Sequence, residues 1–210
     1  MEVEENLNNF LKELNIEPKD LTRPEQVHGA EVFLLDKKYN KRNYSGYPIK
    51  IPGCDALITK IRKLPLAIFT ADCLSVFLYE PETSIIGLIH AGWRGSKDKI
   101  TLRTINLMKE RFKIEPENLM VALGPVIRDC CYEVAGELKD YFLKDYIQER
   151  KAKFYLNLVQ INKRELIESG VKEENIIDPG VCTSCNNDEL FSYRKEGQNA
   201  GRQISLAMLL

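Results

Sequence analysis

Short apolar runs, separated by proline, glycine and charged residues, are the feature that most constrains how this chain folds. They occupy residues 31–35, 55–59, 65–70, 75–79 and 85–90. Each run has the length and the β-branched or aromatic content typical of a strand, so the pattern predicts a sheet. All are far shorter than the ~20 apolar residues that cross a bilayer. We therefore expect no membrane span and no membrane partner.

Helical spacing of apolar residues marks other parts of the chain. It predicts helices at residues 7–14, 96–113, 134–147 and 159–169. Ser96 is expected to cap the second of these helices, and Gly170 to follow the last. Further strands are expected at residues 119–123, 176–178, 189–193 and 203–209. The last of these runs could equally be a buried helix.

The order of these elements predicts the fold class. Runs of strands followed by grouped helices are typical of an α+β protein, here with a mixed β-sheet core flanked by helices. With 210 residues and no internal repeat or linker, the chain is expected to form a single domain over residues 1–210.

Composition excludes several classes of partner. The formal net charge is -1 and no basic block occurs, so nucleic acid is not an expected partner. The first ten residues lack the basic start and apolar core of an export signal, which predicts a cytoplasmic protein. Its six cysteines are then expected to stay reduced, as core residues, metal ligands or catalytic thiols.

Both histidines of the chain lie beside glycine-containing turns. His28 stands in Gln26-Val27-His28-Gly29, and His90 ends an expected strand. Cys73 also follows a strand and is preceded by Asp72, a carboxylate that could orient a metal ligand. Two imidazoles and one thiolate make a three-ligand zinc site with an open fourth position, as in catalytic sites. The alternative is that the histidines are structural and Cys73 is a small core residue.

The turn Gly92-Trp93-Arg94-Gly95 follows His90 and precedes the expected helix 96–113. Backbone N–H groups and the Arg94 guanidinium could hold a phosphate there, together with Gly95. Alternatively, Arg94 pairs with a surface carboxylate. Trp93 could stack on a base or fill core volume.

The remaining cysteines point to structure more than to catalysis. Cys182-Thr183-Ser184-Cys185 has the spacing of half a structural zinc site or of a redox pair, but no second such pair occurs. Cys130 and Cys131 are adjacent, and neighbours in an extended segment point to opposite faces. We therefore expect one of them to face the core.

Several strings along the chain together carry a family resemblance. They are Gln26-Val27-His28-Gly29, Asp55-Ala56-Leu57, Ala71-Asp72-Cys73, His90-Ala91-Gly92-Trp93-Arg94-Gly95, Gly124-Pro125, Cys130-Cys131-Tyr132-Glu133-Val134 and Phe191-Ser192-Tyr193-Arg194. In this order they resemble the purine nucleoside phosphorylase family whose members were once described as polyphenol oxidases or laccases. The resemblance runs from about Leu21 to the C-terminus. The family's usual N-terminal segment, whose motifs contribute to the cleft, is expected to be missing.

The resemblance implies an enzyme distantly similar in fold to a toxin with a Cys-His deamidase site. It implies zinc bound through His28, Cys73 and His90, phosphorolysis of adenosine, inosine and methylthioadenosine, and deamination of adenosine. The substrates would be a purine nucleoside and phosphate. In deamination, water activated at the zinc site would attack C6 of adenine, and Asp72 is the candidate to protonate the leaving amine. In phosphorolysis, Arg94 would hold phosphate.

Three other functions remain open from the sequence. Copper-dependent phenol oxidation is less favoured than zinc chemistry, because two histidines cannot build a multicopper cluster. A hydrolase or deamidase could use Cys73 as a nucleophile activated by His90, with no metal. A protein lacking the N-terminal segment could also bind metal without being an enzyme.

Overall fold

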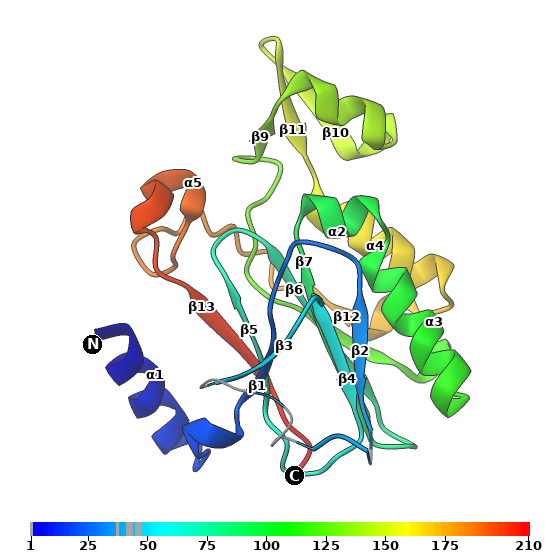
Figure 1. Cartoon of the computed structure of the whole chain (residues 1–210). Coiled ribbons are helices and arrows are strands. Elements are labelled where there is room, and N and C mark those ends of the chain that lie inside the picture. Colours follow the sequence, from blue (N-terminus) through cyan, green and yellow to red (C-terminus); the bar gives the residue numbers. More distant parts are fainter. Residues whose placement is uncertain (1, 37, 41–43, 45–47) are drawn as a thin grey trace.

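The computed structural model describes residues 2–36, 38–40, 44 and 48–210. Within these residues the strands form three sheets (Figure 1). The largest has the order β12-β8-β6-β7-β4-β2 and mixes parallel and antiparallel pairs. Its strands are β2 (Val32–Leu35), β4 (Ala56–Thr59), β6 (Leu74–Glu80), β7 (Ile85–Ala91), β8 (Met120–Leu123) and β12 (Ile176–Ile177).

A second sheet has the order β13-β5-β1-β3 and faces the first. Its strands are β1 (Thr22–Pro24), β3 (Ile49–Ile51), β5 (Leu66–Thr70) and β13 (Gln203–Ala207). One buried cluster joins the two sheets, with Ile51 and Ile68 from one and Leu57 and Leu88 from the other. Because strand β7 is packed on both faces, all of its residues are buried.

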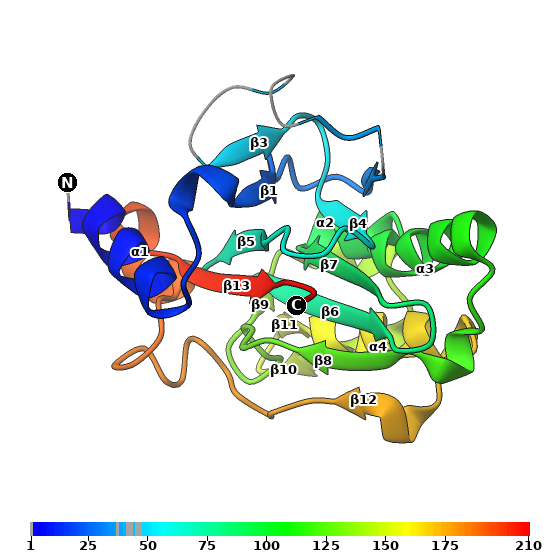
Figure 2. The same cartoon turned by 90° about the horizontal axis from the view of Figure 1, so that it is seen from below.

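The described helices are α1 (Glu2–Glu13), α2 (Trp93–Lys97), α3 (Ile100–Phe112), α4 (Leu158–Glu168) and α5 (Tyr193–Glu196). Some of them cover the outer faces of the two facing sheets. Helix α3 packs on the large sheet through Ile105 and Met108, while α1 packs on the β5-β13 face through Leu11. Figure 2 shows α1 and α3 on opposite sides of the paired sheets.

The third sheet, β10-β11-β9, stands beyond one end of the sheet pair (Figure 1). It contains β9 (Glu133–Val134), β10 (Ile147–Arg150) and β11 (Lys153–Leu156). Short 3-10 turns connect these and other elements. They are η1 (Pro18–Asp20), η3 (Pro116–Asn118), η4 (Gly136–Tyr141), η5 (Lys144–Tyr146), η6 (Glu173–Asn175) and η7 (Gly197–Asn199).

The structure confirms the α+β class and most of the expected strands. The expectation of a helix at 134–147 is wrong, since η4 and η5 occupy most of that segment and β9 begins it. The strand expected at 189–193 is also wrong, because this segment is turn and coil that leads into α5. The run 203–209 contains strand β13, which pairs with β5. The apolar patterns of residues 134–147 and 189–193 did not show which other segments would pack against them.

The expected helix 96–113 is two helices. Lys99 has a φ of 62°, a left-handed conformation that ends α2 and starts α3 in a new direction. Ser96 lies inside α2 and does not cap a helix; its hydroxyl accepts a hydrogen bond from Asn162 on α4. Helix α4 ends as expected, and Gly170 follows it with a φ of 104°.

Among the described residues, none of the helices is both long enough and apolar enough to traverse a bilayer.

Glu165 on α4 gives the fold a pH dependence. Its side chain is buried, its carboxylate accepts a hydrogen bond from the Leu102 N–H (3.2 Å), and burial raises its pKa from 4.5 to about 7. Between these values the unfolded chain loses a proton that the folded chain keeps, so stability falls as pH rises through this window. Glu165→Gln removes the titrating carboxyl and with it this pH-dependent loss of stability. The unfolding free energy of the variant relative to the parent should rise by roughly 1–3 kcal/mol from pH 4.5 to 8 in urea titrations.

Glu110→Gln, at an exposed position of α3, is the control for removal of one negative charge. An equal pH trend for Glu165→Gln and Glu110→Gln would contradict this account of Glu165.

Candidate functional site

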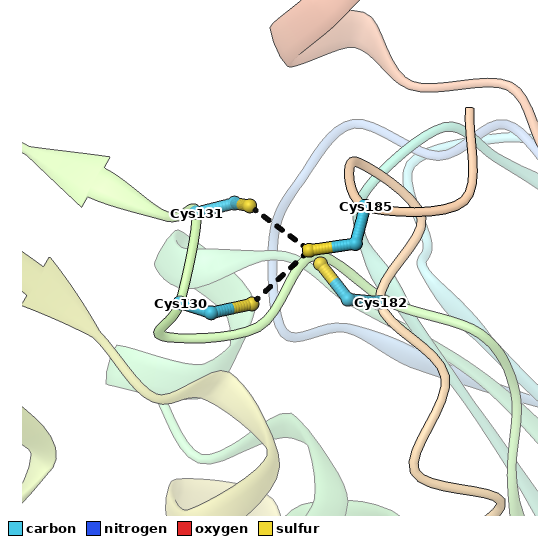
Figure 3. Close-up of side chains that lie close together, drawn as sticks. All are labelled: Cys130, Cys131, Cys182 and Cys185. Carbon is cyan, nitrogen blue, oxygen red and sulfur yellow. Dashed lines mark hydrogen bonds between the residues drawn. The ribbon is translucent and has the colours of Figure 1, made fainter.

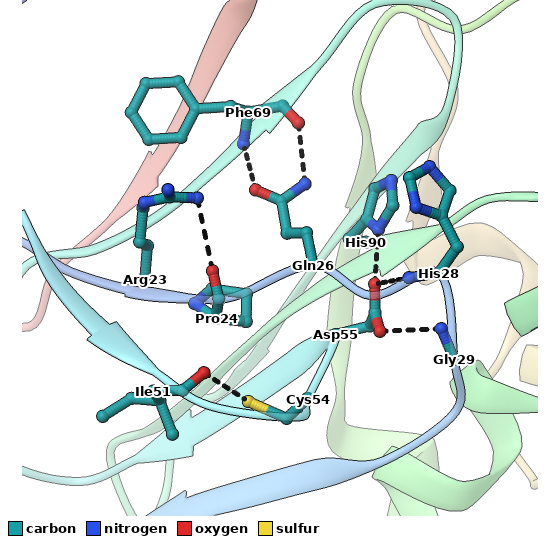
Figure 4. Close-up of polar contacts among 10 residues, drawn as sticks. All are labelled: Arg23, Pro24, Gln26, His28, Gly29, Ile51, Cys54, Asp55, Phe69 and His90. Atoms are coloured by element: carbon teal, nitrogen blue, oxygen red, sulfur yellow. Dashed lines mark hydrogen bonds and ion pairs between the residues drawn. The ribbon is translucent and has the colours of Figure 1, made fainter.

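Three side chains converge between the two large sheets, at the end where β1, β5 and β7 finish. His28 lies in the loop after β1, Cys73 in the turn from β5 to β6, and His90 near the end of β7. Their potential ligand atoms all lie within 4.8 Å of one another. The two imidazole rings meet edge to face with centroids 4.8 Å apart (Figure 4). The structure therefore brings together the three residues that the sequence analysis singled out.

Asp55 holds the two histidine-bearing segments of this cluster together. Its buried carboxylate accepts hydrogen bonds from His90 Nδ1 (2.7 Å), the His28 N–H (2.9 Å) and the Gly29 N–H (2.8 Å). Figure 4 shows the carboxylate between the His90 ring and the His28 loop. With Nδ1 of His90 bonded to Asp55, Nε2 is the nitrogen left to bind a ligand. Such a carboxylate fixes the ring orientation and raises the basicity of a metal-binding histidine.

The loop that carries His28 is held in an unusual backbone conformation. Gln26 and His28 have φ angles of 64° and 60°, a region that costs most non-glycine residues roughly 1 kcal/mol or more. The Gln26 amide offsets this cost by exchanging two hydrogen bonds with the backbone of Phe69 on β5, at 2.7 and 3.0 Å. The loop is thereby joined to the four-stranded sheet and presents His28 to Cys73.

Two glycines allow the turn after His90 to approach this loop closely. A Cβ on Gly92 would lie 3.1 Å from Cys73 Sγ and 3.3 Å from His28 Cδ2. A Cβ on Gly95 would lie 2.7 Å from the Gly29 carbonyl oxygen. Gly95 therefore has no room for a side chain, and a side chain at Gly92 would press on Cys73 and His28.

Cys73 and His90 favour opposite charges. Burial disfavours the Cys73 thiolate, but contacts with His28 and His90 outweigh it and lower the thiol pKa to about 6. Burial likewise disfavours protonated His90, but Asp55 and Cys73 raise its pKa to about 9. A thiolate facing an imidazolium is therefore the favoured state in the absence of a metal. Thiolate and imidazole are also soft and borderline ligands suited to a transition metal.

The cluster opens into a cavity of about 820 Å³. Trp93 and Arg94 line it, and the Arg94 guanidinium lies 4.4 Å from the centre of the Trp93 ring. The lining also includes three arginines and three aromatic residues that the sequence analysis did not assign to a site: Arg23, Arg194, Arg202, Phe69, Tyr132 and Tyr193. The cavity thus combines positive charge with aromatic surface next to the three potential ligands. Gly95 is not among its lining residues and instead packs against Gly29.

The sequence model described as Multi-copper polyphenol oxidoreductase laccase matches residues 1–210. The chain belongs to this family. It is 31% identical over 189 residues to "Purine nucleoside phosphorylase YlmD" of Geobacillus stearothermophilus, covering 86% of this chain and 69% of that protein. It is 29% identical over 201 residues to "Adenosine deaminase RL5" from an unknown prokaryotic organism, covering 92% and 76%.

The fold of this family member is also found among solved structures. The hypothetical protein YfiH of Bacillus licheniformis superimposes with a TM-score of 0.91 at 25% sequence identity, covering 98% of this chain and 80% of that one. The relatives named above are a nucleoside phosphorylase and a deaminase, so the family includes enzymes that act on nucleosides.

Asp72 lines the cavity beside Cys73, but its carboxylate is occupied by hydrogen bonds. It accepts from the hydroxyls of Thr183 (2.6 Å) and Ser192 (2.8 Å) and from the Arg194 N–H (2.6 Å). These bonds join the turn that carries Cys73 to two later segments. The proton-donor role of Asp72 stays a prediction, and the carboxylate that contacts a candidate metal ligand is Asp55.

Asp55 was present in the family strings, but the sequence analysis gave it no role. The sequence did contain a signal for a role of Asp55, because an acidic residue directly before the buried strand β4 must find hydrogen-bond partners within the fold. No pattern in the sequence identified those partners as His28 and His90. Arg23, Arg194 and Arg202 were not assigned to the site because they are widely separated along the chain from the motifs that carry the other site residues.

Asp55→Asn tests whether the Asp55 carboxylate raises the pKa of His90 in this protein. The variant loses the carboxylate that raises the pKa of His90, and its amide nitrogen would face an N–H donor. In the protein freed of metal with a chelator, we expect the His90 pKa to fall from about 9 by about one unit or more. NMR titration of the imidazole nuclei can follow this, since the chain has two histidines.

Asp98→Asn, at an exposed position that ends α2, is the matched control. A His90 pKa that is the same in Asp55→Asn and in the parent would contradict the role given to Asp55.

Proposed function

We propose that this protein is a zinc-dependent purine nucleoside phosphorylase that also deaminates adenosine. One observation carries the proposal: His28, Cys73 and His90 meet at the wall of a cavity that also presents Arg94 and Trp93. Three ligands are the number that leaves a zinc ion with one position for chemistry. The names of the family relatives support both activities.

The ligand set suits zinc better than the copper of the family description. A multicopper centre needs more imidazoles than the two that the chain contains. One thiolate and two imidazoles, with Asp55 behind His90, match the donor chemistry of zinc and the carboxylate support of a ligating histidine. When bound, zinc supplies Lewis acidity beside the substrate.

Phosphate is assigned to Arg94. Its side chain is exposed within the cavity lining, and the Trp93 ring supports one face of the guanidinium. The planar edge of a guanidinium pairs with two phosphate oxygens, which would hold the nucleophile close to the sugar. Arg23, Arg194 and Arg202 add positive charge to the same cavity.

The purine base is assigned to the aromatic part of the cavity. Trp93 and Tyr132 are partly exposed there, and flat apolar rings stack on nucleobases in the same way at sites that bind single bases. The cavity volume of about 820 Å³ lies within the range of small-ligand sites. In phosphorolysis, the base would leave as the sugar passes to phosphate. In deamination, Asp72 remains our candidate to give a proton to the departing amine.

A metal-independent cysteine mechanism is the second candidate. Contacts of Cys73 with His28 and His90 lower the thiol pKa to about 6, so the thiolate needed for nucleophilic attack exists at neutral pH. Zinc chelation separates the two mechanisms, because a chelator would abolish phosphorylase activity and leave a free thiolate nucleophile active.

The first test incubates zinc-loaded protein with adenosine, with and without phosphate, and follows adenine, inosine and ribose 1-phosphate by chromatography. Adenine should form only with phosphate, and Cys73→Ala should abolish its formation because a zinc ligand is lost. Arg94→Ala should raise the KM for phosphate about 10-fold or more, as expected for loss of a charged hydrogen bond.

Arg103→Ala is the control for Arg94→Ala, since Arg103 is exposed on α3 and is not part of the cavity lining. Equal phosphate dependence in Arg94→Ala and Arg103→Ala would remove Arg94 from the proposed phosphate site. Full activity in the presence of a strong zinc chelator would remove zinc from the mechanism.

A further inference from the structure

Four of the six cysteines meet at a second place in the fold. Cys130 and Cys131 come from the turn before β9, and Cys182 and Cys185 from a later turn. The Sγ atom of Cys185 lies 3.6 Å from that of Cys130 and 3.4 Å from that of Cys131. All four sulfur atoms lie within 4.8 Å of one another, and Figure 3 shows them directed at a common point.

Both adjacent cysteines contribute to this cluster, which corrects the expectation that one of them faces the core. The expectation assumed an extended segment, but residues 129–131 form a turn closed by hydrogen bonds from the Cys131 and Tyr132 N–H groups to the Arg128 carbonyl. In a turn, neighbouring side chains can point to the same side. Cys130 is exposed and Cys131 half-buried. Cys130 and Cys131 thus join Cys182 and Cys185, whose spacing the sequence analysis had recognised as half of a possible zinc site.

The spacing of the sulfur atoms fits a tetrahedral metal site. Zinc–sulfur bonds of about 2.3 Å place the four sulfurs of a tetrahedron about 3.8 Å apart. The separations of 3.6 and 3.4 Å from Cys185 are close to that value and well above the ~2.05 Å of a disulfide bond. A disulfide would use two of the sulfurs, whereas one metal ion uses all four. Each thiol would lose its proton to solvent on binding.

Hydrogen bonds and a β-bridge already fix the backbone of the two turns that carry the four cysteines. The Arg128 N–H donates a hydrogen bond to Cys182 Sγ (3.4 Å), which favours negative charge on that sulfur. A β-bridge between Val126 and Cys182 joins the two cysteine-bearing segments next to the cluster. The Asn186 N–H and side-chain amide both donate to the Cys182 carbonyl and close the second turn.

We propose that Cys130, Cys131, Cys182 and Cys185 bind one zinc ion in a closed structural site, separate from His28, Cys73 and His90. Four thiolates fill the coordination sphere and leave no position for a substrate, so the ion stabilises structure.

This site would fasten two walls of the cavity to each other. Tyr132, which lines the cavity, directly follows Cys131. Thr183, which directly follows Cys182, donates a hydrogen bond to Asp72 beside Cys73 (2.6 Å). A zinc ion shared by the two turns would therefore limit the movement of residues on both sides of the cavity.

The test uses the full chain carrying Cys73→Ser, which removes a ligand from the other candidate site. After purification under reducing conditions, metal analysis should find about one zinc per chain, as a single closed site requires. Cobalt exchanged into this protein should give the intense visible bands of a tetrahedral ion and strong thiolate-to-cobalt charge transfer. Adding Cys185→Ser or Cys130→Ser, both at exposed positions, should remove the zinc or weaken these bands.

Adding Cys54→Ala instead is the matched control, because Cys54 belongs to neither cluster and should leave zinc and spectrum unchanged. The proposal would be overturned by a Cys73→Ser protein that binds neither zinc nor cobalt, by iron in place of zinc, or by a disulfide that persists under reducing conditions. These readouts need no substrate, so they stand apart from any failure of the proposed enzyme activity.

Discussion

The buried carboxylate of Asp55 is the contact on which the arrangement of the candidate active site depends. Its side chain bonds to His28, Gly29 and His90, while its backbone N–H donates to Glu31 and its carbonyl accepts from the His90 N–H. One residue thereby links the loop after β1, the start of β4 and the end of β7. Removing the carboxylate would leave the buried ring N–H of His90 without this acceptor, a loss of order 1–3 kcal/mol.

The structure contains two sulfur-containing clusters near Asp72, and their chemistry differs. The cluster of His28, Cys73 and His90 has three ligands and borders a cavity, whereas the four-cysteine cluster is complete in itself. The hydrogen bond between Asp72 and Thr183 connects their neighbourhoods. In our account, an open site that reacts with substrate is held in place by a closed site that does not.

Much of this arrangement could be predicted from local sequence, and the rest depended on contacts between distant segments. The unbroken apolar run at residues 85–90 predicted a strand ending at His90, and its lack of polar alternation agrees with a strand packed on both faces. Nothing local distinguished the 3-10 turns η4 and η5 from a helix, since their apolar spacing is also helical. The partners of Asp55 and the convergence of Cys130 and Cys131 on Cys185 arise from tertiary packing, which sequence spacing does not encode.

The most direct test of the central claim is anomalous diffraction at the zinc absorption edge from crystals of the zinc-loaded protein. The account predicts an anomalous peak bonded to Cys73 Sγ, His90 Nε2 and a ring nitrogen of His28, at the wall of the cavity. A zinc-loaded crystal with no peak there, and with Cys73 still in contact with the His90 ring, would contradict it. That result would favour a cysteine and histidine pair that works without metal.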